Sequence, residues 1–253
     1  MGEDITGWAD RIEHAIGRIE RCAVAQVYVY QRVSSTQDAA FRHRFDGRGV
    51  LAIASEQTAG RGRLGRRWDD GVAATLPLSI AIRTGLDDVG LAARAGLAAL
   101  DACADRLPGV DVLIKWPNDI IVRSDSADQK LAGVLIERRD GHAIVGIGIN
   151  IRSIVTEKRY DPVSFDQLGV RADRCDLAIG VIERFSAWLH SDDLAVRARW
   201  ASSDAMIGTA RAFESDRTPV RGTVTSLDPL RSIVIRTGEG DREIAVASAR
   251  NLD

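Results

Sequence analysis

Residues 110–151, VDVLIKWPNDIIVRSDSADQKLAGVLIERRDGHAIVGIGINI, contain four apolar runs separated by short polar turns. The runs cover Val110 to Lys115, Ile120 to Arg123, Leu131 to Glu137 and His142 to Ile151. They are rich in valine and isoleucine, which favour strands. The last two runs are joined by a short turn, so we predict that they form consecutive antiparallel strands. This stretch predicts a sheet around which the rest of the chain can be placed.

Further elements flank this stretch. Helical spacing or composition predicts helices over residues 4–21, 37–45, 90–106, 176–190 and 193–200, and short apolar runs predict strands over 24–33, 50–55 and 76–83. Ser34, Ser35 and Thr36 offer N-cap hydroxyls for the second helix. The predicted fold class is α+β, with a mixed, mainly antiparallel sheet and flanking helices.

The pattern changes near residue 203. Short strands predicted over 209–213, 220–227, 232–237 and 242–247 alternate with turns at Asp228-Pro229 and Gly238-Glu239-Gly240. We therefore predict a main domain over residues 1–203, which starts with a short helix within residues 1–22. A small β-barrel-like module is predicted over residues 204–253.

The composition excludes several classes of protein. The chain has 253 residues, of which 45% are hydrophobic and 28% charged, and its net charge is −2. These values argue against a disordered chain and against binding of nucleic acid by bulk positive charge. No apolar run approaches the roughly 18 residues of a membrane span, and the acidic, mixed N-terminus is not a signal peptide. Three distant cysteines indicate a reducing compartment, so we expect a cytoplasmic protein that does not bind membranes.

Lysine and asparagine are scarce in this chain. Lysines are only three of the 34 basic residues, namely Lys115, Lys130 and Lys158, and the asparagines are Asn118, Asn150 and Asn251. Two of the lysines and one asparagine lie within a single 16-residue stretch. The arginine excess can reflect coding preference alone. The clustering instead favours positions at which arginine cannot replace a compact ammonium group.

The strongest local motif is the run from Gly60 to Trp68, GRGRLGRRW. It formally satisfies the G-x-G-x-x-G fingerprint of dinucleotide-binding proteins, but that fingerprint must open a helix, and a strand is predicted here instead. A phosphate-binding P-loop is excluded because no Gly-Lys-Ser/Thr follows. What remains is a flexible glycine loop whose guanidinium groups suit phosphate or carboxylate, unless it is only an exposed basic loop.

Three further motifs place polar groups at strand ends. Lys115-Trp116-Pro117-Asn118-Asp119 joins two predicted strands and suits a triphosphate with its Mg²⁺, although the same residues are common in tight turns. Lys130-Leu131-Ala132-Gly133 begins a strand, and Gly133 would let a ligand approach the backbone. Gly146-Ile147-Gly148-Ile149-Asn150 is a glycine-bearing strand that ends in a rare asparagine.

Several kinds of active site are missing from the sequence. The four histidines are scattered without metal-ligand spacing, and neither a G-x-S-x-G elbow nor a Cys/His signature occurs. The remaining motifs indicate electrostatic positioning of anions rather than attack by a nucleophilic side chain.

At these motifs the sequence resembles the biotin–protein ligases, or biotin–[acetyl-CoA-carboxylase] ligases. The four motifs appear in the family's order, and Ser35-Thr36 before a helix matches the family's upstream Ser-Thr pair. The resemblance covers about residues 24–200. It implies the class II synthetase-like catalytic fold of biotin ligases and an SH3-like barrel at the C-terminal end.

The resemblance also implies a two-step reaction. Biotin's carboxylate attacks the α-phosphate of ATP to give biotinyl-5′-AMP and pyrophosphate, and a lysine of a biotin carboxyl carrier protein then attacks the mixed anhydride. ATP, Mg²⁺ and biotin would be substrates, without a tightly bound prosthetic group. Two anions must meet in this reaction, so cations are needed to offset their repulsion.

The family's functional residues can be carried over position by position. The resemblance assigns biotin binding to Ser35, Thr36, Gln37, Gln57, Gly60, Arg61, Gly62, Arg63, Lys130 and Gly133. It assigns ATP binding to Arg63, Arg66, Trp68, Asn118, Lys130 and Asn150, and catalysis to Arg61, Arg63, Lys115, Asp119 and Lys130. Mg²⁺ would arrive with ATP near Asn118, without a cluster of protein ligands of its own.

The sequence departs from the family's pattern at three places, one of which is a somewhat long loop from Ser124 to Gln129. Gln37 stands where the family often has asparagine. Only about 22 residues precede the first predicted strand, too few for the winged helix-turn-helix domain of family members that repress transcription. A monofunctional ligase that does not bind nucleic acid is therefore expected, and both a monomer and a side-by-side homodimer remain open.

Two other functions stay in competition with the ligase. One is a related acyl ligase or transferase of the same fold that acts on lipoate or octanoate; the Gly-Arg-Gly-Arg and Lys-Trp-Pro-Asn-Asp motifs argue against it. The other is a non-catalytic biotin or nucleotide sensor, against which Lys130 and Arg63 argue.

Overall fold

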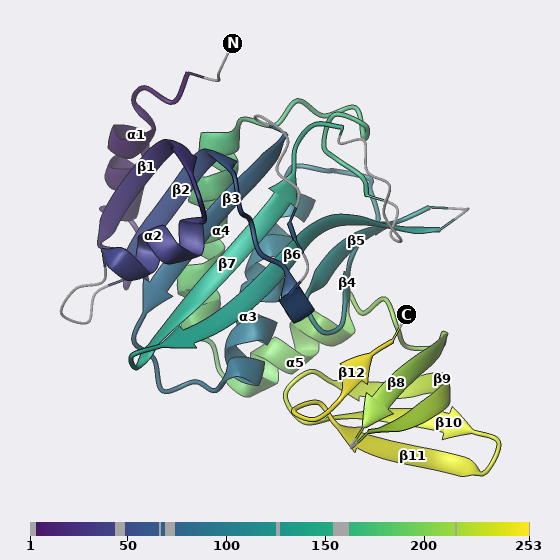
Figure 1. Cartoon of the computed structure of the whole chain (residues 1–253). Helices are drawn as coiled ribbons and strands as arrows, with labels where there is room; N and C mark the ends of the chain where they lie inside the picture. Colours follow the sequence, from purple (N-terminus) through teal and green to yellow (C-terminus); the bar gives the residue numbers. More distant parts are fainter. Residues whose placement is uncertain are drawn as a thin grey trace.

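A seven-stranded sheet forms the centre of the computed structural model, which describes residues 4–43, 49–65, 67–68, 74–124, 127–153, 162–215 and 217–252. Its strands are β1 (Gln26–Val33), β2 (Val50–Gln57), β3 (Thr75–Ile82), β4 (Val112–Lys115), β5 (Asp119–Arg123), β6 (Asp128–Arg139) and β7 (His142–Asn150). Their spatial order is β1-β2-β3-β7-β6-β5-β4 (Figure 1). Among the described strands of this sheet, β1 and β2 form the one parallel pair, so the predicted mixed, mainly antiparallel sheet is confirmed.

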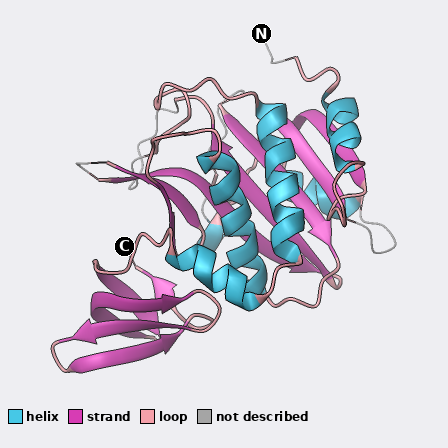
Figure 2. Cartoon of the chain, turned by 180° about the vertical axis from the view of Figure 1, so that it is seen from behind, coloured by secondary structure: helices cyan, strands magenta, loops and turns pink. Residues whose placement is uncertain are grey.

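Helices cover the two faces of this sheet unequally. One face carries α1 (Trp8–Ile16), α3 (Asp88–Ala104), α4 (Arg174–Leu189) and α5 (Asp193–Ala201), which lie in front of the strands in Figure 2. The opposite face carries α2 (Thr36–Arg42), which packs on β2, β3 and β7 through Ala39 and Ala40. Because one short helix covers only part of that face, the remainder is open to a ligand.

The helix ends show where local sequence rules hold and where they do not. Asp87, Asp173 and Asp192 accept backbone N–H groups at the starts of α3, α4 and α5, as N-cap carboxylates should. The predicted side-chain cap of α2 is wrong, because Ser35 occupies the N-cap position without making a capping hydrogen bond. The first helix is also shorter than the predicted span of residues 4–21, since Gly7 has a φ of 81° and the helix ends at Ile16.

The C-terminal strands form a second, five-stranded antiparallel sheet. It contains β8 (Ala210–Ser215), β9 (Thr218–Asp228), β10 (Ser232–Thr237), β11 (Gly240–Ala245) and β12 (Arg250–Asn251) in the order β11-β10-β9-β8-β12. Among the described residues its edge strands do not pair, so the sheet is open. It lies beside the β4–β5 edge of the main sheet, and Trp116 contacts Phe213 across this junction with ring centroids 6.1 Å apart (Figure 1).

Of the helices that the structure describes, none is both long and apolar enough to cross a membrane.

Candidate active site

A cavity of about 1060 Å³ occupies the part of the sheet that α2 leaves uncovered. Its floor is made by the middle of β3, β6 and β7, and its walls come from the start of α2, the loop after β2 and the β4–β5 turn. Residues 250–252, at the C-terminal end of the chain, also line it. Segments that are far apart in the sequence thus meet at one concave site, as expected of a binding site for small molecules.

The residues from Gly60 to Trp68, which we call the glycine loop, form a narrow turn over the cavity. The backbone of Arg61 pairs with that of Arg67, and the Trp68 N–H donates to the Gly60 carbonyl at 3.0 Å. Among its described residues a three-residue 3₁₀ turn, Arg63–Gly65, is the only helical element, and the next described element is the strand β3. The described residues therefore agree with the rejection of the dinucleotide fingerprint, which requires an α-helix after the loop.

Trp68 lies against the glycines of the cavity floor. A β-carbon on Gly148 would come within 2.5 Å of the indole, and one on Gly133 within 3.1 Å. The Lys130 ammonium lies 5.3 Å from the centre of the Trp68 ring. These two glycines, on neighbouring strands, therefore make room for an aromatic side chain beside a cation.

A buried polar cluster lies at the α2 end of the cavity. The Gln57 Oε1 accepts both the backbone N–H of Thr36 at 2.7 Å and the Thr36 hydroxyl at 2.9 Å. The same hydroxyl lies 2.8 Å from the Ser79 Oγ. Within the described part of the chain, the buried Ser35 Oγ has no hydrogen-bond partner. Hydroxyl and amide groups in an otherwise apolar site suit the polar head of a neutral ligand.

The cations and carboxylates lie toward the β4–β5 turn. Lys130 Nζ is 2.6 Å from Asp119 Oδ1, and both side chains are mostly shielded from solvent, at 17% and 30% exposed. The Asn118 amide donates to the Val134 carbonyl at 2.7 Å, which turns its Oδ1 toward Arg63 Nη1 at 3.3 Å. The ammonium group of Lys130 and the guanidinium group of Arg63 thus lie at the same end of the cavity, where they can bind an anion.

Arg61 is held differently from the other cations. Its guanidinium forms four hydrogen bonds with the carboxylates of Asp38 and Glu137, at 2.8–3.1 Å. Arg139 binds the same two carboxylates from the other side. The hydrogen bonds from Arg61 contribute most to holding the pKa of Asp38 below its usual value. We call Asp38, Arg61, Glu137 and Arg139 the acid–arginine cluster.

Most of the residues predicted from the sequence meet at this one cavity. The lining includes Thr36, Gln37, Gln57, Arg61, Gly62, Arg63, Trp68, Lys115, Asn118, Asp119, Lys130 and Gly133. Ser35 and Gly60 lie next to it in the chain but are not in its lining, and Arg66 is outside the described residues.

Asn150 is not in the lining either. Its amide donates to the Lys130 carbonyl at 3.0 Å and to the Val163 carbonyl at 3.2 Å, which fixes the start of β6. A direct contact of Asn150 with a nucleotide stays a prediction.

Sequence reasoning missed Ser79, Asp128 and residues 250–252, which also line the cavity. Ser79 is a buried hydroxyl in the middle of a largely apolar strand, a polar residue that could have been noticed. The contribution of residues 250–252 depends on the packing of the second sheet and has no local signal.

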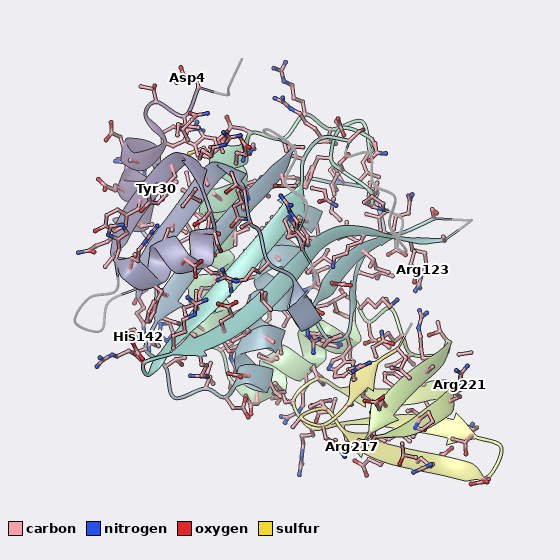
Figure 3. All side chains as sticks on the ribbon, viewed as in Figure 1. Asp4, Tyr30, Arg123, His142, Arg217 and Arg221 are labelled. Carbon is pink, nitrogen blue, oxygen red and sulfur yellow. The ribbon has the colours of Figure 1, made fainter. Side chains whose placement is uncertain are left out.

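The described residues contain no group of three or more His, Cys, Asp or Glu side chains that could hold a metal ion. The histidines do not meet at the cavity; His142, for example, lies at the β6–β7 turn (Figure 3).

Comparison with known proteins agrees with this geometry. The model of the biotin/lipoate A/B protein ligase family matches residues 29–152, which include every segment that lines the cavity except the C-terminal one. A biotin–[acetyl-CoA-carboxylase] ligase of Mycobacterium tuberculosis is 37% identical over 148 residues, which cover 55% of this chain and 53% of that relative. The chain thus spans about half the length of that relative. The bifunctional ligase/repressor BirA of Bacillus subtilis is 27% identical over 87% of this chain and 73% of its own length.

Solved structures share the fold. A biotin protein ligase from Aquifex aeolicus, in complex with biotin and ATP, superimposes with a TM-score of 0.77 and 25% identity, over 89% of this chain and 99% of the other. A biotin protein ligase from Leishmania major, at 24% identity and a TM-score of 0.63, shows the same fold over 90% of this chain.

Proposed function

Because residues 29–152 match the model of the biotin/lipoate A/B protein ligase family, we propose that this chain is an ATP-dependent biotin–protein ligase. It activates biotin as biotinyl-5′-AMP and transfers the biotinyl group to a lysine of a biotin carboxyl carrier protein. The observation that carries the proposal is the arrangement within one cavity: the cluster of Thr36, Gln57 and Ser79 at one end and the Lys130–Asp119 pair at the other. The similarity to ligases named for biotin and to a structure with biotin and ATP supports it.

The ring system of biotin occupies the end of the cavity near Thr36. Its ureido group has N–H donors and a carbonyl acceptor, which match the amide and hydroxyl groups of Gln57, Thr36 and Ser79. The buried, unpaired Ser35 Oγ supplies a further group once it turns toward the ligand. Gln37, whose amide contacts the Leu135 carbonyl at 3.3 Å, closes the side of this end.

Lys130 brings the two anions together. Its ammonium pairs with Asp119, and we propose that it shifts onto the biotin carboxylate and the α-phosphate as they bind. A carboxylate oxygen then forms a bond to the α-phosphorus, while the bond from phosphorus to the bridging oxygen breaks and pyrophosphate leaves. Arg63 and Lys115, which line the same region, offset the charge of the phosphates, and Trp68 stacks on the adenine.

Mg²⁺ enters as part of the ATP substrate. The oxygen donors available to it are the Asn118 Oδ1 and the Asp119 carboxylate, and oxygen ligands of this kind suit Mg²⁺ when several waters remain bound. Once Lys130 leaves Asp119, that carboxylate is available to the metal–triphosphate and to the incoming lysine.

In the second step the amine of the carrier lysine attacks the carbonyl carbon of the mixed anhydride. The bond from that carbon to the AMP oxygen breaks, so AMP leaves and the amine loses a proton. We propose residues 1–203 as the catalytic domain and residues 204–253 as an SH3-like module that completes the cavity with residues 250–252. The free cysteines Cys22, Cys103 and Cys175 support a cytoplasmic location.

The experiment that tests this function measures pyrophosphate release. The protein is incubated with Mg-ATP and either biotin or lipoate, each with and without a biotin carboxyl carrier domain. Biotin-dependent release followed by labelling of the carrier is the expected result. Release of pyrophosphate with lipoate but not with biotin would instead indicate the lipoate branch of the family. Binding of biotin without release of pyrophosphate would indicate a sensor.

A further inference from the structure

The acid–arginine cluster connects three elements that line the cavity. Asp38 belongs to α2 and directly follows Thr36 and Gln37. Glu137 belongs to β6, four residues after Gly133, and Arg61 belongs to the glycine loop. All four hydrogen bonds of the Arg61 guanidinium go to these two carboxylates. The helix, the strand and the loop are therefore joined at a single side chain.

The cluster is charge-balanced and partly shielded. Two guanidinium groups face two carboxylates, and the four side chains are between 22% and 35% exposed. Arg139 lies over the Phe41 ring at 5.6 Å, which holds the second cation in place. Networks with fork-like arginine–carboxylate geometry hold backbone segments more firmly than isolated surface pairs do.

The position of Arg61 in the loop decides what the cluster does. Gly62 and Arg63, the next two residues, line the cavity, and the Trp68 N–H is bonded to Gly60 just before Arg61. A loop with glycines at 60, 62 and 65 has little stiffness of its own. Fixing the Arg61 side chain therefore holds the start of the loop, directly before the two residues that line the cavity.

We propose that Asp38 and Glu137 are positioning residues that, through Arg61, clamp the glycine loop over the biotin end of the cavity. Neither of the two residues lines the cavity. Arg61 thereby acts as an anchor of the loop, whereas the resemblance assigns it to biotin binding and catalysis. The effect on biotin rests on the proposed function, whereas the effect on the loop does not.

The clamp is tested with Asp38→Asn and Glu137→Gln, which keep the shape of each side chain and remove its charge. Asp105→Asn is the matched control, because Asp105 pairs with Arg184 at 2.7 Å on the helical side of the sheet. In the ligand-free protein, amide hydrogen exchange over residues 58–65 is expected to rise at least fivefold in the two cluster variants and to stay unchanged in the control. Unchanged exchange in the cluster variants would overturn the clamp, whatever the ligand of the protein is.

Steady-state kinetics give the second readout. The KM for biotin is expected to rise roughly three- to tenfold in both cluster variants, with a smaller change in the KM for ATP and in kcat. Asp38→Glu, which keeps the charge, should recover part of the loss. A lowered KM for biotin would overturn the proposal, because it would mean that the carboxylates hold Arg61 away from a ligand. Absence of pyrophosphate release from the unmodified protein would refute the proposed function, while the exchange measurement would still decide on the clamp.

Discussion

Trp68 and Gly148 are in such close contact that a β-carbon at residue 148 would lie 2.5 Å from the indole Cε2 and 2.6 Å from Cζ2. The glycine is therefore required by the tryptophan, not by a turn. The contact joins the last residue of the glycine loop to the centre of β7, and so sets where an aromatic surface faces the cavity.

Gly148→Ala should displace Trp68 and weaken the use of ATP. Stacking of a base on an aromatic side chain contributes about 1–3 kcal/mol, so the KM for ATP should rise about tenfold or more. Pyrophosphate release at varied ATP measures it. Gly85→Ala is the control, since a β-carbon there meets nothing within 4 Å. Equal KM values for ATP in both variants would contradict the stacking role.

Lys130→Arg should lower the rate of adenylate formation although the positive charge is kept. The ammonium lies 2.6 Å from Asp119, and the planar, larger guanidinium cannot replace a compact charge between two anions. Loss of one group that stabilises developing charge lowers kcat about 100-fold or more. Arg32→Lys, at the exposed Arg32–Glu56 pair, is the control. A near-normal single-turnover rate for Lys130→Arg would remove Lys130 from its proposed role.

Thr36→Val should raise the KM for biotin and destabilise the protein. Valine keeps the shape but leaves Ser79 without the hydroxyl partner it has at 2.8 Å. An unsatisfied buried group costs about 1–3 kcal/mol of folding stability. The loss of a hydrogen bond of about 1.4 kcal/mol to biotin would raise the KM for biotin roughly tenfold. Thr36→Ser retains the hydroxyl and should behave almost as the unmodified protein. If the serine variant loses as much biotin affinity as the valine variant, the hydroxyl is not what the site uses.

The acid–arginine cluster should make the stability of the fold depend on pH at the acidic end. The pKa of Asp38 lies below its ordinary value of 3.8, mainly through its hydrogen bonds from Arg61. A carboxyl group with a lowered folded pKa stabilises the fold above its unfolded pKa, and this contribution disappears as the pH falls through the folded pKa. Asp38→Asn should therefore lower Tm at pH 7, and the difference in Tm from the unmodified protein should shrink steadily as the pH falls below 3.8. A drop in Tm that stays the same from pH 7 down to the most acidic pH at which both proteins are folded would show that the charge is not involved.

The architecture of the main sheet follows largely from local patterns. The strands of residues 110–151 and the capped starts of α3, α4 and α5 are encoded by apolar runs and N-cap aspartates within a few residues. The motif residues also meet as expected, because strand ends and glycines are local features.

What the sequence could not predict depends on distant contacts. The Thr36 hydroxyl bonds to Gln57 and Ser79, which belong to two strands distant in the sequence. Ser35 is the N-cap residue of α2 but makes no capping hydrogen bond. The resemblance assigns Arg61 to biotin binding and catalysis, and its bonds to Asp38 and Glu137 could not be predicted because these residues lie 23 and 76 positions away in the sequence. The second sheet is open in its hydrogen bonding, although short alternating strands alone suggested closure.

The most direct test of the proposed two-step reaction follows the oxygen atoms of biotin's carboxylate. The protein, biotin labelled with ¹⁸O in its carboxyl group, Mg-ATP and a carrier domain are incubated, and the products are analysed by mass spectrometry. If the carboxylate attacks the α-phosphate and the lysine then attacks the carbonyl carbon, one ¹⁸O atom appears in AMP and none in pyrophosphate. Unlabelled AMP, or ADP with labelled inorganic phosphate, would contradict attack of the carboxylate on the α-phosphate.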